Sequence, residues 1–190
     1  MKKKLFLSAV LTICAAIAAT GTLAYFTAED TAHNVITSGY VDIELEEWSE
    51  LPSEDGDGVP FEDVAGVMPG AEISKIVTVK NIGDADAYIR VKADLDVILA
   101  DNVIGTPNLS LVHIDYNTHD WTEKDGYWYY NSVLSPDEIT SPLFTTVKFD
   151  ESMGNMYQNS IAYVDVSAQA VQVANNGDTV MDANGWPGAE

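Results

Sequence analysis

Residues 73–97, ISKIVTVKNIGDADAYIRVKADLDV, contain the pattern that decides the fold of this chain. From Ala87 to Val97 every second residue is apolar and most residues between them are charged, while residues 73–81 are rich in β-branched side chains. This alternation is typical of a strand with one buried and one solvated face, and β-branched residues favour strands. We therefore expect two strands, joined into an antiparallel pair by the short loop at Gly83 and Asp84.

Similar strand-like runs recur on both sides of this stretch. They lie at residues 41–45, 109–116, 143–149 and 161–173, and Asp125 with Gly126 marks the tight turn of a hairpin over residues 121–130. Between the strands there are turns and no long helical pattern. These features predict an all-β fold, a single jelly-roll or immunoglobulin-like β-sandwich of about eight antiparallel strands over residues 35–174. A polar C-terminal tail follows at residues 175–190, with Trp186 as its anchor.

The first 24 residues have the composition of a helical signal peptide. Lys2, Lys3 and Lys4 precede an uncharged apolar run at residues 5–19, and small residues follow up to Ala24. This order of charge, apolar run and small residues is that of a secretory signal. The run is shorter than the roughly 20 residues of a permanent membrane anchor. We expect cleavage between Ala24 and Tyr25, and contact with the membrane only during export.

The charge of the remaining chain restricts its partners. The sequence has 9 lysines and arginines against 30 acids, and three of the lysines lie in the signal, which has no acid, so the mature part carries six against 30, a net charge of −24. Such a chain repels nucleic acid and anionic surfaces, whereas cations or positive cell-envelope groups are allowed partners. The single cysteine, Cys14, also lies in the signal, so the mature chain has no disulfide.

Residues 25–34 have no periodic pattern, and we interpret them as an N-terminal arm without a core of its own. The arm leads from Tyr25 and Phe26 to Val35, where the sandwich begins. An unpaired segment of this kind suits addition as an extra strand to the edge of a sheet, because such addition uses main-chain hydrogen bonds.

Catalytic motifs are missing from the sequence. It has no His-Glu-x-x-His, Gly-x-Ser-x-Gly or phosphate-binding Gly-rich loop, so we expect no enzyme and no cofactor. His113, Asp115 and His119 form a weak candidate zinc site, but two surface histidines beside a turn are the preferred interpretation. The acidic loop at residues 47–67, with Asp55-Gly56-Asp57-Gly58, is a weak candidate for calcium.

The aromatic residues of the hairpin at residues 121–130 have two interpretations. Cross-strand aromatic packing is the preferred one. The other is a carbohydrate-binding platform, which would make the protein a monomeric surface adhesin.

Five segments resemble the TasA, CalY and camelysin family of exported proteins from Gram-positive bacteria. They are GTLAYFT at 21–27, SGYVDIEL at 38–45, PG at 69–70 with VTVKNIGDADAYIRV at 77–91, DGYWYYN at 125–131 and AQAVQ at 168–172. The likeness covers nearly the whole chain. It implies cleavage by a SipW-type signal peptidase, a jelly-roll sandwich, and life outside the cell in biofilm matrix fibres or at a cell or spore surface.

In fibre-forming members of this family the N-terminal segment of one subunit adds as a strand to the next. The resemblance therefore favours a secreted structural protein whose main partner is a copy of itself, with the arm at Tyr25, Phe26 and Val35 as the donor strand. Some relatives carry a metallopeptidase label, so a secreted metal-dependent protease is an alternative. This chain lacks the zinc-binding helix motif that would support it.

Overall fold

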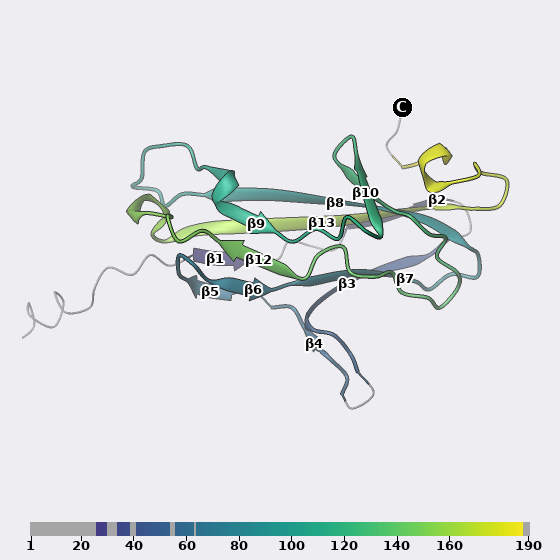
Figure 1. Cartoon of the computed structure of the whole chain (residues 1–190), viewed down its shortest axis with the longest axis horizontal. Coiled ribbons are helices and arrows are strands. Elements are labelled where there is room, and N and C mark those ends of the chain that lie inside the picture. The colour runs from purple at the N-terminus through teal and green to yellow at the C-terminus, as the bar shows by residue number, and fades with distance from the viewer. Residues whose placement is uncertain (1–25, 30–33, 39–40, 54–55, 63, 188–190) are drawn as a thin grey trace, which may run out of the picture.

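Two long strands run through the molecule and pair with each other along their whole length. The computed structural model describes residues 26–29, 34–38, 41–53, 56–62 and 64–187. In it, β8 (Ala87–Ile98) lies antiparallel to β13 (Ser160–Gln172), in a register that runs from Ile98 opposite Ile161 to Ala87 opposite Gln172. Figure 1 shows both strands spanning the molecule from end to end. They form the centre of the larger sheet.

The larger sheet has the order β10-β11-β8-β13-β1-β5, and β2 also pairs with β13. Its further strands are β1 (Phe26–Glu29), β2 (Asn34–Ser38), β5 (Val64–Val67), β10 (Trp121–Lys124) and β11 (Tyr127–Tyr130). The sheet is antiparallel except where β1 and β2 run parallel to β13.

Two three-stranded sheets supply the strands that face this sheet across the core. One has the order β4-β3-β7 and the other β6-β12-β9. Their strands are β3 (Ile43–Glu50), β4 (Val59–Pro60), β6 (Glu72–Ser74), β7 (Ile76–Asn81), β9 (Val112–Ile114) and β12 (Thr146–Phe149). The helical content of the described residues is three short 3-10 turns, η1 (Leu109–Leu111), η2 (Asn155–Tyr157) and η3 (Val180–Asp182).

The alternating residues of the long strands form the core, as the pattern predicts. Ile89, Val91 and Val97 of β8 and Val164 and Val166 of β13 are buried against apolar residues of the facing strands. The predicted all-β sandwich is therefore confirmed. The described residues contain 13 strands rather than about eight. The predicted run at residues 73–81 is divided into β6 and β7, and β1, β2, β4 and β5 lie outside the predicted runs, at the N-terminal arm and in the acidic loop.

The predicted antiparallel pair at residues 73–97 is wrong. β7 pairs with β3, and β8 pairs with β13 and β11, so the two runs lie in different sheets. The turn at residues 82–86 carries the chain from one layer to the other. The error has a physical reason: alternation reports that one face of each strand is buried, and this holds equally for neighbours in one sheet and for strands in facing sheets.

A buried ion pair interrupts the apolar core. Glu47 occupies the inward position that follows Val41, Ile43 and Leu45 in the alternation of β3, and its Oε2 lies 3.0 Å from Nζ of Lys75, with both side chains 3% exposed. The Lys75 ammonium also lies 4.2 Å from the centre of the Phe61 ring. A buried acid at this position needs a buried cation.

The C-terminal segment folds back onto the outer face of the larger sheet, and Trp186 is its anchor, as predicted. Trp186 and Val180 pack with Tyr88, Tyr129 and Val171 in a second apolar cluster. Figure 1 shows this segment, in yellow, at one end of the sandwich. On the sheet, Arg90 is the residue that the Trp186 ring covers.

Arg90 is 6% exposed, and its guanidinium lies over two rings, 4.0 Å from the centre of Tyr127 and 4.6 Å from that of Trp186. It donates hydrogen bonds to Gln169 Oε1 at 2.8 Å and to the Tyr129 hydroxyl at 3.2 Å. Stacking on aromatic faces suits a delocalised guanidinium better than an ammonium.

Candidate functional site

The N-terminal strands β1 and β2 lie in one row along the same edge of β13. In β1, Phe26 pairs with Ser160 and Glu29 with Tyr163, an offset of 134 residues. In β2, Asn34 pairs with Ser167 and Ser38 with Val171, an offset of 133. The registers of β1 and β2 along β13 thus differ by one residue. Together the two strands occupy the position of one long strand.

β1 is an interior strand of the sheet. It has β13 on one side and β5 on the other, with Thr27 opposite both Ile161 and Ala65. In the part of the chain that the structure describes, β5 reaches the sheet only through β1. The slot between β13 and β5 is therefore filled by the first described residues of the chain, and removing β1 would leave unpaired backbone groups on both neighbours.

The position of β1 inside the sheet differs from the expectation of an N-terminal arm without a core. The expected boundary placed residues 25–34 outside the sandwich, whereas the structure pairs Phe26 and Asn34 with β13 through their backbones, as it does Val35. The Val-Ile-Thr run at residues 35–37 is the one signal that could have predicted β2. Tyr25 and the predicted cleavage site after Ala24 lie outside the described residues.

Each residue of the weak candidate metal site has its own local partner. His113 Nε2 lies 3.6 Å from Asp150 Oδ2. Asp115 accepts hydrogen bonds from the backbone N–H groups of Thr145 and Thr146, at 2.8 and 2.7 Å, and from the Thr145 hydroxyl at 2.6 Å. His119 Nδ1 lies 2.6 Å from Asp120 Oδ1. Among the described residues no three His, Cys, Asp or Glu side chains are grouped to hold a metal ion.

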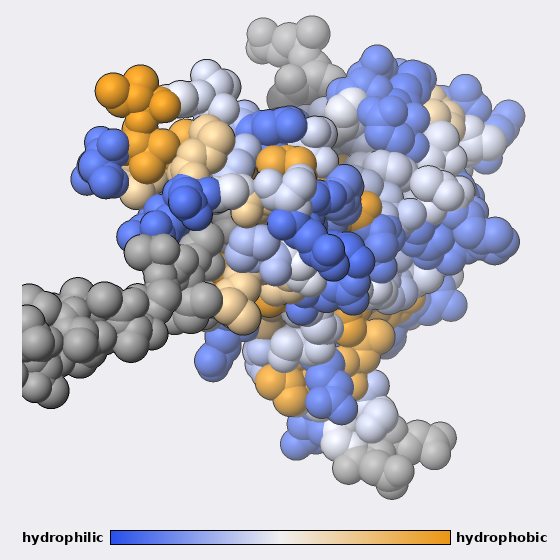
Figure 2. Space-filling view, turned by 60° about the vertical axis from the view of Figure 1, so that its left-hand side comes forward, coloured by the Kyte–Doolittle hydropathy of each residue, from blue (hydrophilic) through white to orange (hydrophobic). Residues whose placement is uncertain are grey.

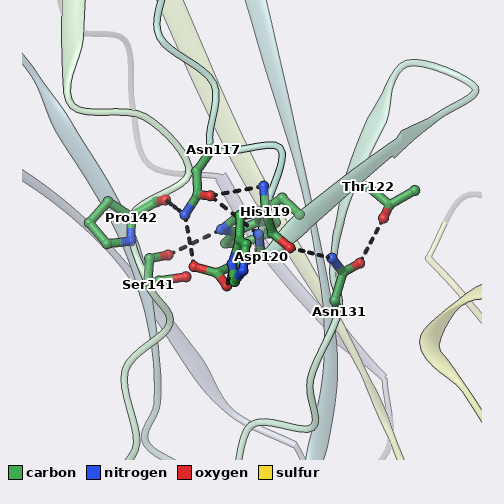
Figure 3. A network of polar contacts seen from close by, with 8 residues as sticks. Asn117, His119, Asp120, Thr122, Asn131, Ser141 and Pro142 are labelled. Carbon is green, nitrogen blue, oxygen red and sulfur yellow. Dashed lines mark hydrogen bonds and ion pairs between the residues drawn. The ribbon is translucent and has the colours of Figure 1, made fainter.

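The polar network around His119 stabilises the turn at residues 117–120 (Figure 3). Asn117 accepts hydrogen bonds from the backbone N–H groups of His119 and Asp120, and its amide donates to Asp120 Oδ2 at 3.0 Å and to the Pro142 carbonyl at 3.1 Å. Hydrogen bonds to the carboxylate, foremost from the Asn117 amide, lower the pKa of Asp120 to about 2. Asp120 is therefore ionised at neutral pH, and its oxygens hold the turn.

The acidic loop forms a protruding hairpin between β3 and β4 (Figures 1 and 2). Ser53 and Gly56 close its tip through a pair of backbone hydrogen bonds, 2.9 and 3.2 Å long. Gly58 has φ of +77° and lies against Pro52, where a Cβ atom would come within 2.6 Å of the Pro52 nitrogen, so this turn needs glycine. Asp55, half of the weak calcium candidate, lies outside the described residues.

The aromatic residues of the second hairpin pack in the way expected. Trp121 is 1% exposed and faces Tyr130, its cross-strand partner, with the ring centres 5.0 Å apart. Trp128 stacks on Tyr116 at 4.4 Å. Asp125 and Gly126 both have positive φ, which is the type I′ turn that the sequence predicts. Four rings thus pack in two pairs, Trp121 with Tyr130 and Trp128 with Tyr116.

Comparisons with family models, curated proteins and solved structures find no match to this chain. No helix among the described residues is long and apolar enough to cross a membrane. The slot between β13 and β5, which β1 fills, is the structural feature that bears on function.

Proposed function

We propose that this chain is a secreted structural protein of an extracellular matrix or cell surface, and that its copies assemble by exchanging their N-terminal strands. The observation that carries the proposal is the interior position of β1 between β13 and β5. The strand that fills this slot comes from the first part of the mature chain, so the same slot can accept the corresponding strand of another copy.

Exchange of this kind costs little, because the exchanged strand makes the same type of backbone hydrogen bonds in the new chain as in its own. Binding in the slot requires an extended backbone but no particular side chains. Release of β1 leaves β5 and one edge of β13 unpaired, which gives a strong tendency to refill the slot. Signal cleavage would free the start of the strand and so allow exchange after export.

A proline at Thr27 tests the role of β1. In an interior strand every backbone N–H faces one neighbour or the other, so Thr27→Pro should remove a hydrogen bond from the slot wherever the strand is bound. We expect fibres of the mature protein, seen by electron microscopy, to be lost or reduced at least tenfold. Thr27→Ala keeps the N–H and is the matched control.

Removal of residues 25–35 is the second arm of the same experiment. It should abolish assembly, and a peptide of residues 25–38 added to the intact mature protein should cap free slots and shorten the fibres. Normal fibres from the truncated protein would contradict strand exchange, because no donor strand would remain.

A further inference from the structure

A groove lies on the outer surface of the three-stranded sheet β4-β3-β7, on the face turned away from the core. Its floor consists of side chains of β3 and β7, where Glu46 lies opposite Thr78 in the register. It is bordered by Leu51 and Pro52, where the protruding hairpin begins, and by the segment at residues 139–142, which runs beside β7. Figure 2 shows hydrophobic side chains around the foot of this hairpin.

The size and lining of the groove suit a small molecule. Its volume is about 440 Å³, and ligand pockets in proteins have about 300–1,000 Å³. Leu51 is 39% exposed and Ile139 is 51% exposed at its borders, and Trp48 lies on its floor. Apolar and aromatic side chains with a few polar groups between them are the usual lining of a ligand pocket.

The polar groups of the floor are held in place on one side and available on the other. Glu46 Oε2 accepts hydrogen bonds from the Trp48 indole N–H at 3.4 Å and from the Thr78 hydroxyl at 3.2 Å. These contacts fix the carboxylate beside the indole. Among the described residues, Glu46 Oε1 and the ammonium of Lys80 have no hydrogen-bond or ion-pair partner, although Glu44 lies opposite Lys80 in the register. The groove therefore offers one acceptor and one donor.

The charges of the groove indicate the class of its ligand. Its lining has one acid, Glu46, and one base, Lys80, and two further acids, Glu50 and Glu138, adjoin its border residues in the sequence. An anionic ligand would be repelled by these acids and by the strongly acidic chain. A cationic ligand would place a like charge beside Lys80. A neutral ligand avoids both penalties.

A sugar has the chemistry that matches this lining. Each hydroxyl both donates and accepts hydrogen bonds, so neighbouring hydroxyls can donate to Glu46 and accept from Lys80. The C–H groups on the face of a pyranose ring form an apolar surface that can lie on the Trp48 indole, since an aromatic ring presents a large apolar face. The rings of the aromatic hairpin, in contrast, pack on other rings of the fold.

We infer that this groove binds a neutral oligosaccharide, with one sugar ring on Trp48 and its hydroxyls between Glu46 and Lys80. The groove lies outside the larger sheet that contains the β1 slot, so the inference does not depend on strand exchange. In a secreted matrix or surface protein, such a site attaches the chain to polysaccharide.

Titration of the mature protein with three neutral probes, cellotetraose, maltotetraose and chitotetraose, tests the inference. We expect at least one of them to shift the tryptophan emission with saturation, at a Kd of about 1 mM or below. Tetragalacturonate, an acidic oligosaccharide of the same length, should bind at least tenfold more weakly. The absence of a saturable shift with all three neutral probes up to about 10 mM would overturn the inference, and so would equal or tighter binding of tetragalacturonate.

Substitutions place the bound probe in the groove. Trp48→Ala should weaken its binding at least tenfold, and Trp48→Phe, which keeps a ring, should weaken it less. Glu46→Gln and Lys80→Met should each weaken it at least fivefold. Lys124→Met, on the exposed edge strand β10 outside the groove, is the matched control and should bind as the unchanged protein does.

Urea unfolding of each variant shows that the fold is intact, and Glu46→Gln keeps the size of the side chain in case Trp48→Ala unfolds. Unchanged binding by both Glu46→Gln and Lys80→Met, or an equal loss in Lys124→Met, would place the sugar elsewhere and refute the site. All these variants should form fibres as the unchanged protein does. Failure of strand exchange and failure of sugar binding are therefore distinguishable.

Discussion

Asn81 shows how one side chain holds together the end of the sandwich at which the chain passes from β7 to β8. It is fully buried at the end of β7, where its amide donates to the carbonyls of Ala85 at 2.8 Å and Leu134 at 2.9 Å. Its Oδ1 accepts from the Gly83 N–H at 3.0 Å. One amide thus ties the turn after β7 to the segment that follows the aromatic hairpin. A buried amide with both donors and its acceptor used is strongly preferred over any other residue type.

Substitution of Asn81 should therefore be costly. Asn81→Ala removes all three hydrogen bonds of a buried amide, and at about 1 kcal/mol for each we expect a loss of about 3 kcal/mol in the free energy of unfolding. Asn81→Asp should cost at least as much, because a carboxylate would face the two carbonyls. Urea unfolding measures both. The exposed Asn131→Ala is the control, and an equal loss there would contradict the argument.

The C-terminal segment is the element whose role differs most from the expectation. Its apolar residues, Val180 and Trp186, cover the outer face of the larger sheet, and the Trp186 ring covers the Arg90 guanidinium. Without this cover the aromatic rings around Arg90 would be exposed to water. The segment therefore acts as part of the sandwich, and its polar composition reflects the solvated side of a short folded loop.

Trp186→Ala should lower the free energy of unfolding by about 3 kcal/mol, as for other buried aromatic residues. Trp186→Phe keeps a ring over the guanidinium and should lose less than half as much. Unfolding in urea followed by tyrosine fluorescence measures both. A loss below about 0.5 kcal/mol for the alanine variant would show that the segment does not stabilise the sheet.

At the scale of the whole molecule, charge opposes the proposed association. With the predicted signal removed, the chain has a net charge of −24 and should repel its own copies, and the repulsion extends about 30 Å at 0.01 M salt and about 8 Å at 0.15 M. Pairing in the strand slot acts over shorter distances. The proposed assembly therefore needs the long-range repulsion to be screened.

We expect the rate of fibre formation, followed by light scattering, to rise at least tenfold between 0.01 M and 0.15 M sodium chloride. An equal ionic strength supplied by potassium chloride is the control for screening, and it should give the same rate. A rate that falls with salt would mean that opposite charges on the two copies attract, contrary to the net charge of −24.

Much of the fold could be predicted from the sequence because its signals are local. The alternation from Ala87 to Val97, the Asp125-Gly126 turn and the aromatic pair Trp121 and Tyr130 each follow from neighbouring residues. Glu47 continues the alternation of Val41, Ile43 and Leu45, which places it inward. The lysine that neutralises it lies 28 positions further along the chain, and no local pattern identifies it.

The sequence by itself determined most of the strands and the faces they bury, because a period of two residues is set by the geometry of the extended backbone. It did not indicate β1, β4 and β5, which lie in segments without that period. Only the tertiary structure decided which strands are neighbours. It placed β7 beside β3 rather than β8, β1 in the slot between β13 and β5, and Trp186 over Arg90. Backbone hydrogen bonds are the same for every partner, so the choice depends on the packing of the whole core.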